Sequence, residues 1–231
     1  MKFCGLQKTT LLDYPGHVAA TIFLGGCNFR CPFCHNSGLI GSDAKPLFSE
    51  EEIISFLIKR KGILESVCIT GGEPTLSGEL ESFIRKIREL GYLIKLDTNG
   101  YRPDVLKKLI AGDLLDYAAM DIKSGREHYK KAAGIGHLTI SDVEESAAFL
   151  MENRIPYEFR TTVVKGIHTM GDFVDIGKWL EGESSYFLQN YVDSDQVLCP
   201  GYTSFSVSEL QGFLKILKPF LPRAVIRGET F

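Results

Sequence analysis

The 231-residue sequence lacks a long apolar segment. No stretch reaches the roughly 18 apolar residues of a membrane span, and the first residues lack the apolar core of a secretory signal peptide. It also lacks a stripe of one charge, because 26 Lys and Arg oppose 29 Asp and Glu for a net charge of −3. We therefore expect a cytoplasmic protein that binds neither membranes nor nucleic acid.

Cysteine is scarce outside one short segment. Three of the six cysteines fall within GGCNFRCPFCHN, residues 25 to 36. A reducing compartment disfavours a disulfide framework, so the clustered trio indicates metal or redox chemistry. We expect the scattered Cys4, Cys68 and Cys199 to be buried and inert.

Alternation is the dominant pattern of the chain. Short apolar, β-branched runs alternate with amphipathic segments, which is typical of βα units around a parallel sheet. The predicted strands are 18–24, 66–70, 92–96, 117–120, 157–164 and 186–191, with 224–228 as a seventh candidate. The predicted helices are 79–90, 104–111, 172–181 and 208–218, with S-x-x-E capping boxes at Ser49 and Ser141 beginning two more.

Six βα units are too few for a closed eight-unit barrel, which typically needs about 250 residues. Right-handed crossovers nevertheless curl the sheet. We predict an α/β fold, an open partial TIM-type barrel of about six βα units, with parallel strands and outer helices. A single domain would fill residues 1–231, with a core at about 15–191 and a C-terminal extension at about 192–231.

Chemically distinctive segments follow the predicted strands. The cysteine cluster follows the first strand, and the next four are followed by GGEPT (71–75), DTNG (97–100), DIK (121–123) and KGIH (165–168). Active sites of parallel α/β folds gather at the carboxyl ends of the strands. The sequence therefore predicts one site built from all these loops.

The spacing C-x3-C-x2-C of Cys27, Cys31 and Cys34 suits three irons of a [4Fe–4S] cluster held by one loop. A purely electron-carrying cluster normally takes a fourth cysteine, so its absence leaves one iron open to another ligand. Zinc is the competing interpretation, although the C-x3-C half fits it less well. The candidate fourth zinc ligands are His35, Cys68 and Cys199.

These motifs resemble a known family. CNFRCPFCHN is similar to the CxxxCxφC signature of the radical S-adenosylmethionine (SAM) superfamily, with Phe33 as the aromatic φ, and GGEPT resembles its GGEP motif. CHN, LDTNG and MDIK are similar to glycyl-radical-enzyme activases such as pyruvate formate-lyase activating enzyme. Residues 5–36 most resemble the branch of anaerobic ribonucleotide-reductase activating proteins. The resemblance covers roughly residues 5–191.

The resemblance implies a mechanism and partners. The open iron would bind the amino and carboxylate groups of SAM. An electron from the cluster would break a C–S bond, giving methionine and a 5′-deoxyadenosyl radical that removes hydrogen from a glycine of a partner glycyl radical enzyme. A flavodoxin or ferredoxin-type protein would donate the electron. Since residues 35–67 lack cysteine, only one cluster is expected.

The GGEPT segment would hold the ammonium of the methionine moiety. The carboxylate of Glu73 and the backbone of Gly71 and Gly72 suit a cation, and glycine permits close backbone approach. Pro74 would fix the exit from the turn. Without the cysteine loop beside it, the same segment is equally consistent with an ordinary βα turn.

Asp97 and Asp121 end adjacent predicted strands, where two carboxylates repel unless a cation lies between them or one is protonated. The matching aspartates of pyruvate formate-lyase activating enzyme take part in a monovalent-cation site. We predict such a site here, with Thr98 contributing an oxygen. The alternative is that an aspartate caps the next helix.

Three further side chains are candidates for contact with the cofactor. Lys123 could reach its carboxylate or ribose, or remain solvated. Asn99 shapes its turn and could touch the ribose. Arg160 lies in a predicted strand, where its charge needs a partner. That partner is either the cofactor site or a structural ion pair.

Two histidines are given no catalytic role. The activase histidine expected near His168 would fall later, where this chain has Asp172 or Asp175. His35 is expected to set loop conformation or to tune the cluster by hydrogen bonding. Two other functions stay open: a radical SAM enzyme acting on a small molecule or another peptide, and a non-catalytic zinc or iron–sulfur protein.

Overall fold

The computed structural model describes residues 1–41 and 43–228. Eight strands form one sheet whose spatial order follows the chain. They are β1 (Phe3–Thr10), β2 (Ala19–Leu24), β3 (Ser66–Gly71), β4 (Leu93–Thr98), β5 (Tyr117–Asp121), β6 (Tyr157–Val163), β7 (Ser185–Asn190) and β8 (Ala224–Ile226). β2 to β8 run parallel, and β1 pairs antiparallel with β2. The six crossovers and the unclosed sheet confirm the predicted open barrel.

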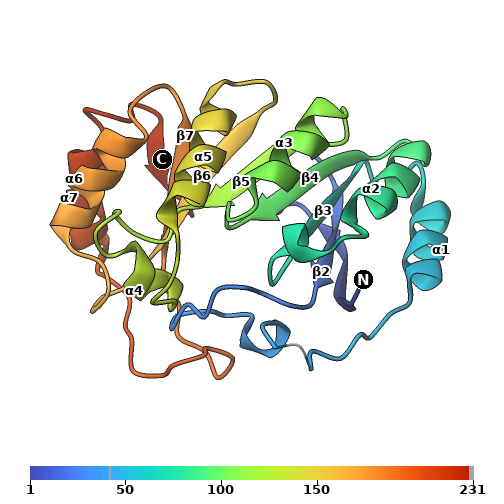
Figure 1. Ribbon diagram of the computed structural model, residues 1–231, viewed down its shortest axis with the longest axis horizontal. Helices are drawn as coiled ribbons and strands as arrows, with labels where there is room; N and C mark the ends of the chain where they lie inside the picture. The colour runs from blue at the N-terminus through green and yellow to red at the C-terminus, as the bar shows by residue number, and fades with distance from the viewer. Residues whose placement is uncertain (42, 229–231) are drawn as a thin grey trace.

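Helices cover the outer side of the curved sheet, apart from α4 (Tyr129–Ala133), which lies below the sheet in Figure 1, beside the loop that follows β2. The others are α1 (Glu50–Arg60), α2 (Leu80–Glu89), α3 (Pro103–Ala111), α5 (Ile140–Met151), α6 (Met170–Trp179) and α7 (Val207–Leu217), with 3₁₀ turns η1 (Ser37–Leu39) and η2 (Pro74–Leu76). α2 shows why they pack: its buried residues recur at helical spacing, as one apolar stripe. These residues are Leu80, Phe83, Ile84 and Ile87. None of the described helices is both long and apolar enough to cross a bilayer.

β1 is the strand that the sequence did not predict. Its central residues Gln7, Lys8 and Thr9 are exposed, so the segment has no continuous apolar run. It lies at the sheet edge, where polar and charged side chains are common because they discourage pairing with other chains. At the opposite edge, the seventh candidate strand is confirmed as β8.

Some helix starts agree with the sequence-based prediction and others do not. The capping box at Ser49 is confirmed, but the one at Ser141 is wrong, because α5 begins at Ile140 after Thr139. α6 begins two residues earlier than predicted, after a Thr169 cap whose partner is aspartate rather than the glutamate of the usual box.

Candidate active site

A cavity of about 200 Å³ opens at the carboxyl ends of β2 to β6. The ten residues predicted to bind the cluster or SAM line it: Cys27, Cys31, Cys34, Gly71, Gly72, Glu73, Asp97, Asn99, Asp121 and Lys123. Arg160 from β6 and the aromatic rings of Phe29 and Phe33 also line it. The chain therefore brings together residues such as Cys27 and Arg160, which are 133 positions apart in the sequence. The KGIH segment (165–168), which was predicted to join the same site, contributes none of the described lining residues, so that part of the prediction is wrong.

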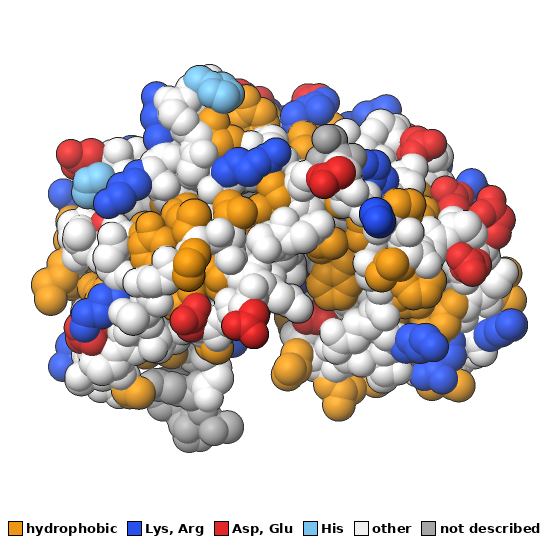
Figure 2. Space-filling model, turned by 90° about the horizontal axis from the view of Figure 1, so that it is seen from below, with side chains coloured by type: hydrophobic (Ala, Val, Ile, Leu, Met, Phe, Trp, Pro, Cys, Tyr) orange, Lys and Arg blue, Asp and Glu red, His pale blue; other side chains and the backbone are white. Residues whose placement is uncertain are grey.

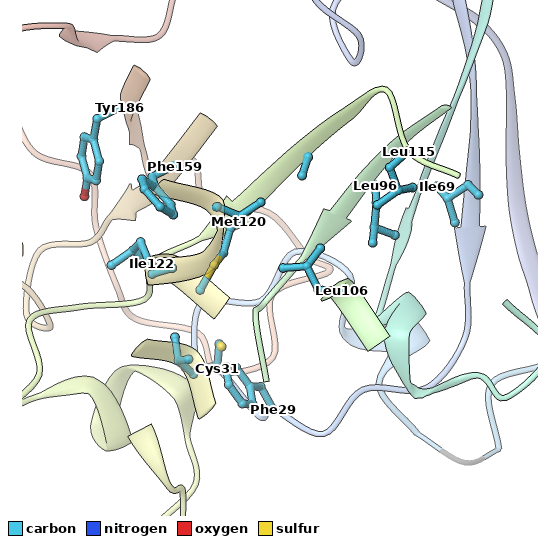
Figure 3. Packing of buried hydrophobic residues seen from close by; sticks show 14 of the residues in the cluster. Phe29, Cys31, Ile69, Leu96, Leu106, Leu115, Met120, Ile122, Phe159 and Tyr186 are labelled. Atoms are coloured by element: carbon cyan, nitrogen blue, oxygen red, sulfur yellow. The ribbon is translucent and has the colours of Figure 1, made fainter. Parts of the chain in front are cut away.

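The cysteine loop packs on the barrel through its aromatic residues. Phe29 and Cys31 are buried, and Figure 3 shows them side by side at the edge of the hydrophobic cluster, near Met120 and Ile122. The backbone N–H of Arg30 donates to the Ala133 carbonyl at 2.9 Å, which docks the loop against the end of α4.

Residues 192–199, which follow β7 and are called the bracing segment below, contact the other side of the cysteine loop. His35 Nε2 lies 2.5 Å from the Val192 carbonyl, and the Cys199 N–H donates to the Pro32 carbonyl at 2.8 Å. These contacts match the expectation that His35 sets loop conformation. Figure 2 views the molecule from below and shows hydrophobic side chains across the middle of this face, with charged side chains around them. Val192 is 68% exposed.

The scattered cysteines differ in environment. Cys4 and Cys68 are buried as expected, but Cys199 is exposed, so the expectation of a buried thiol there is wrong. Cys68 Sγ lies 3.9 Å from Lys95 Nζ inside the barrel. The candidate fourth zinc ligands therefore have other partners or are exposed. Among the described residues, no three His, Cys, Asp or Glu side chains lie close enough together to bind one metal ion.

Burial controls the protonation of the clustered thiols. It raises the pKa of Cys27 to about 11 and that of Cys31 to about 12, and it also raises the pKa of Cys34. The free thiols therefore stay protonated at neutral pH. A bound metal deprotonates a coordinating thiol, so loading of this loop would release protons.

The glycines of GGEPT are required by the cysteine loop. A Cβ on Gly72 would lie 2.1 Å from the Gly26 carbonyl oxygen, and a Cβ on Gly71, whose φ is +121°, would lie 2.3 Å from that of Leu24. The Glu73 N–H donates to the same Gly26 carbonyl at 2.8 Å. The close approach of two backbone segments is therefore enough to explain why both positions are occupied by glycine.

Glu73 is 2% exposed and joins two loops. Its Oε1 accepts hydrogen bonds from Thr75 and from the Thr98 hydroxyl at 2.7 Å, and its Oε2 accepts from the Asn99 N–H at 2.6 Å. Burial raises the pKa of Glu73, although these donors oppose the shift. Oε2 keeps capacity for one more donor, such as an ammonium group. Pro74 opens η2, in agreement with its predicted role at the turn exit.

Arg160 lies between the two aspartates. Its Nη1 is 3.2 Å from Asp97 Oδ2, and its Nε is 2.9 Å from Asp121 Oδ1. Lys95 pairs with Asp97 from two residues earlier on β4, where alternation puts both on one face of the sheet. The helix-cap alternative is wrong for both aspartates, because α3 and α4 follow the caps Arg102 and His128.

These ion pairs determine the charge state of the site. Burial is the largest single influence and would raise the pKa of Asp97 and Asp121, but Arg160 and a lysine at each carboxylate together outweigh it and hold both pKa values below the usual range. Arg160 therefore supplies a positive charge between the two carboxylates, where the sequence also predicts a monovalent cation. Lys95 was missed, although a lysine within the apolar run YLIKL is itself a signal of a buried partner.

Lys123 is held from two directions. Its Nζ lies 3.1 Å from Asp121 Oδ2, and the side chain is 17% exposed, so the solvated alternative is wrong. Burial is the largest single influence and would lower the pKa of Lys123, but its neighbours, with Asp121 first among them, together raise the pKa above the usual range, so the group stays charged. His168 Nδ1 accepts from the Val164 N–H, so its Nε2–H donates to the Lys123 carbonyl at 2.8 Å.

Asp172 occupies one of the positions where the activase histidine was expected. Its carboxylate is 3% exposed and accepts from the Thr169 N–H and the Ser124 hydroxyl, and it lies 2.9 Å from His128 Nδ1. It therefore fixes the loop that follows Lys123 to the start of α6. Long-range roles of this kind carry no local sequence signal.

Comparison with known proteins identifies the family. The sequence model of the Radical SAM superfamily matches residues 21–180 of this chain. The chain belongs to the radical SAM superfamily. Membership implies a [4Fe–4S] cluster and SAM as cofactors, and the buried trio of thiols beside a cavity lined by carboxylates and cations fits both.

Two kinds of curated radical SAM relative differ in extent. A Methanocaldococcus jannaschii protein named "Putative glycyl-radical enzyme activating enzyme" is 31% identical over 96% of this chain and 94% of its own length. A Thermococcus kodakarensis protein named "Probable GTP 3',8-cyclase" is 32% identical over 62% of this chain and 46% of its own length. The first match spans both proteins almost completely, and the second covers a shared part.

Solved structures with the radical SAM fold align closely with this chain. SuiB of Streptococcus suis, bound to its precursor peptide SuiA, aligns over 90% of the chain with a TM-score of 0.69 at 15% identity. The enzyme anSMEcpe with bound AdoMet aligns over 88% with a TM-score of 0.61 at 20% identity. This chain spans 48% of SuiB and 61% of anSMEcpe.

Replacing Gly72 by alanine should prevent stable docking of the cysteine loop, because the added Cβ meets the Gly26 carbonyl at 2.1 Å and Cys27 Cβ at 3.3 Å. After anaerobic reconstitution we expect below about one iron per chain, against about four in the wild type. Gly78→Ala is the matched control, since its Cβ has nothing within 4 Å. Full iron and sulfide content in Gly72→Ala would contradict the assignment of Gly72 as the residue that allows the cysteine loop to dock.

Replacing Arg160 by methionine should lower the free energy of unfolding at pH 7.5 by about 2 kcal/mol, a reduced figure because Asp121 is 33% exposed. The substitution raises the folded-state pKa of both aspartates relative to the wild type. The deficit should therefore shrink as the pH falls toward about 5, because the folded variant takes up protons there.

Urea denaturation at several pH values measures this effect. The wild-type aspartates have depressed pKa values, so their contribution stays constant above the ordinary aspartate value of 3.8. Arg154→Met is the control, because Arg154 and Glu152 form an exposed pair whose loss costs under about 1 kcal/mol. A deficit in Arg160→Met that is independent of pH would exclude the proposed charge balance.

Proposed function

We propose that this chain is a radical SAM activating enzyme that generates a glycyl radical on a partner enzyme, an anaerobic ribonucleotide reductase. The observation that carries the proposal is the extent of the activating-enzyme match, 96% of this chain and 94% of that protein. A peptide bound to SuiB supports a protein substrate for this fold. A flavodoxin or ferredoxin-type donor would supply the electron.

The cysteine loop and the cavity have different roles in the proposed reaction. Cys27, Cys31 and Cys34 hold a [4Fe–4S] cluster whose remaining iron is free for SAM. The cluster and SAM, when bound, supply reductive C–S cleavage and the 5′-deoxyadenosyl radical. The chain itself positions the substrate groups and excludes water.

The lining residues bind the polar groups of SAM. The free lone pair of Glu73 Oε2 and the backbone carbonyls of Gly71 and Gly72 accept from the ammonium. Lys123, charged and fixed by Asp121, faces the carboxylate or ribose. Asn99 reaches the ribose with the amide hydrogen that it does not give to Asn28. Asp97 and Asp121 hold Arg160 and Lys123 in place.

A second candidate is a radical SAM enzyme acting on a small molecule. The match to GTP 3',8-cyclases over part of the chain favours it, because a shared core serves different substrates. The activating enzyme remains the better proposal because the cyclase match covers only 46% of that protein. Family membership leaves no support for a non-catalytic zinc protein.

The decisive experiment mixes reduced, reconstituted protein with SAM and an anaerobic ribonucleotide reductase. We expect 5′-deoxyadenosine together with a glycine-centred doublet in the electron paramagnetic resonance (EPR) spectrum. Cys31→Ser should abolish both signals, whereas Cys199→Ser, an exposed thiol on the bracing segment, should retain both. SAM cleavage without a doublet, for every glycyl radical enzyme tried, would favour the small-molecule alternative.

The monovalent cation at Asp97 and Asp121 remains part of the proposal. Asp121 is 33% exposed and can accept a further cation beside Lys123, but the Thr98 hydroxyl is engaged with Glu73 and Gly100. We expect SAM cleavage in a sodium- and potassium-free buffer to rise severalfold on addition of either ion, at constant ionic strength. Cleavage that is indifferent to both ions would leave Arg160 as the sole counter-charge between the carboxylates.

A further inference from the structure

Asn28, directly after Cys27, carries a polar atom without a partner. Its side-chain Nδ2 is buried and makes no hydrogen bond within the part of the chain that the structure describes. A buried donor left unpaired costs about 1 to 3 kcal/mol. Such an atom next to a candidate cluster ligand indicates that its acceptor arrives with a bound group.

The orientation of this amide follows from its neighbours. The Tyr101 N–H donates to Asn99 Oδ1 at 3.0 Å, which fixes Asn99 with its nitrogen facing Asn28. Asn99 Nδ2 then donates to Asn28 Oδ1 at 2.9 Å. Exchanging oxygen and nitrogen on Asn28 would set two donors against each other. The unpaired group is therefore an N–H donor and not an acceptor.

Two bound groups could offer an acceptor, namely SAM through its oxygens and the cluster through its sulfurs. Asn99 lines the cavity proposed for SAM, whereas Asn28 is hydrogen-bonded to Asn99 but is not one of the lining residues, and it lies within the loop that joins Cys27 to Cys31. The neighbouring Phe29 N–H already points to sulfur, lying 3.3 Å from Cys27 Sγ. The position of Asn28 thus favours sulfur.

We propose that the Asn28 amide donates a hydrogen bond to a sulfur atom of the [4Fe–4S] cluster and thereby raises its reduction potential. Hydrogen bonds to cluster sulfurs are one of the factors that set this potential, since they stabilise the added negative charge. The same amide, through Asn99, is linked to Glu73, so the cluster loop and the proposed SAM-binding loops are positioned together. The inference rests on the proposed cluster but not on the glycyl-radical partner.

Redox titration of reconstituted Asn28→Ala without SAM tests the proposal, with the reduced cluster followed by EPR. At the midpoint potential of the wild type, the ratio of reduced to oxidised cluster should fall about tenfold, a shift of about 59 mV for one electron. Asn36→Ala is the matched control, because the Asn36 amide already has an acceptor in the Gly71 carbonyl. Its ratio should stay near that of the wild type.

Other outcomes would overturn the proposal. An unchanged potential at full iron and sulfide content excludes a bond to the cluster, and an unchanged potential with weaker SAM binding assigns the acceptor to SAM instead. If Asn28→Ala fails to hold its cluster, wild-type protein with asparagine ¹⁵N-labelled in the side-chain amide replaces it. Pulsed EPR should then show coupling of the reduced cluster to ¹⁵N that Asn36→Ala retains, and its absence rejects the bond. None of these measurements requires the partner enzyme, so the proposed function can fail separately.

Discussion

The arrangement of the site depends on one guanidinium group. The register of the sheet sets Asp121 opposite Arg160, and Arg160 also reaches Asp97 from the strand beyond. Lys95 and Lys123 extend the row, so charges alternate across the carboxyl ends of three strands. Well-packed apolar side chains usually stabilise a core at least as well as buried ion pairs do. A row of this kind at the mouth of a cavity is therefore explained better by ligand binding than by stability.

The cysteine loop is held by the elements that also form the cavity. Gly72 packs against its first turn, α4 holds Arg30, and the segment after β7 holds Pro32 and His35. A loop that must present three thiolates to one cluster loses little conformational entropy on binding if it is ordered beforehand. The short spacing of the cysteines is thus only part of the site, because the neighbouring loops supply the rest of its geometry.

The sequence predicted the site better than it predicted the contacts that support it. Segments such as GGEPT and DIK were placed correctly at the carboxyl ends of strands, because the strands themselves can be recognised from local hydrophobic periodicity. β1, with its exposed Gln7 and Lys8, lacked that periodicity. Asp172 and the bracing segment at 192–199 escaped because they act through partners that are distant in the sequence, such as Ser124 and Pro32.

Under the proposed function, the residues beyond the family match are the part of the chain that would select the substrate. The family match ends at residue 180, and partial relatives with other names share only part of the chain. After residue 180 the described chain comprises β7, the bracing segment, α7 and β8, and β1 lies before the match begins at residue 21. The bracing segment contacts the cysteine loop directly and leaves Val192 exposed, so under the proposed function it would both support the cluster loop and offer a surface to a partner. A partner that docks there would contact the element that holds the cluster loop, which joins substrate recognition to the chemistry through a single short stretch of backbone.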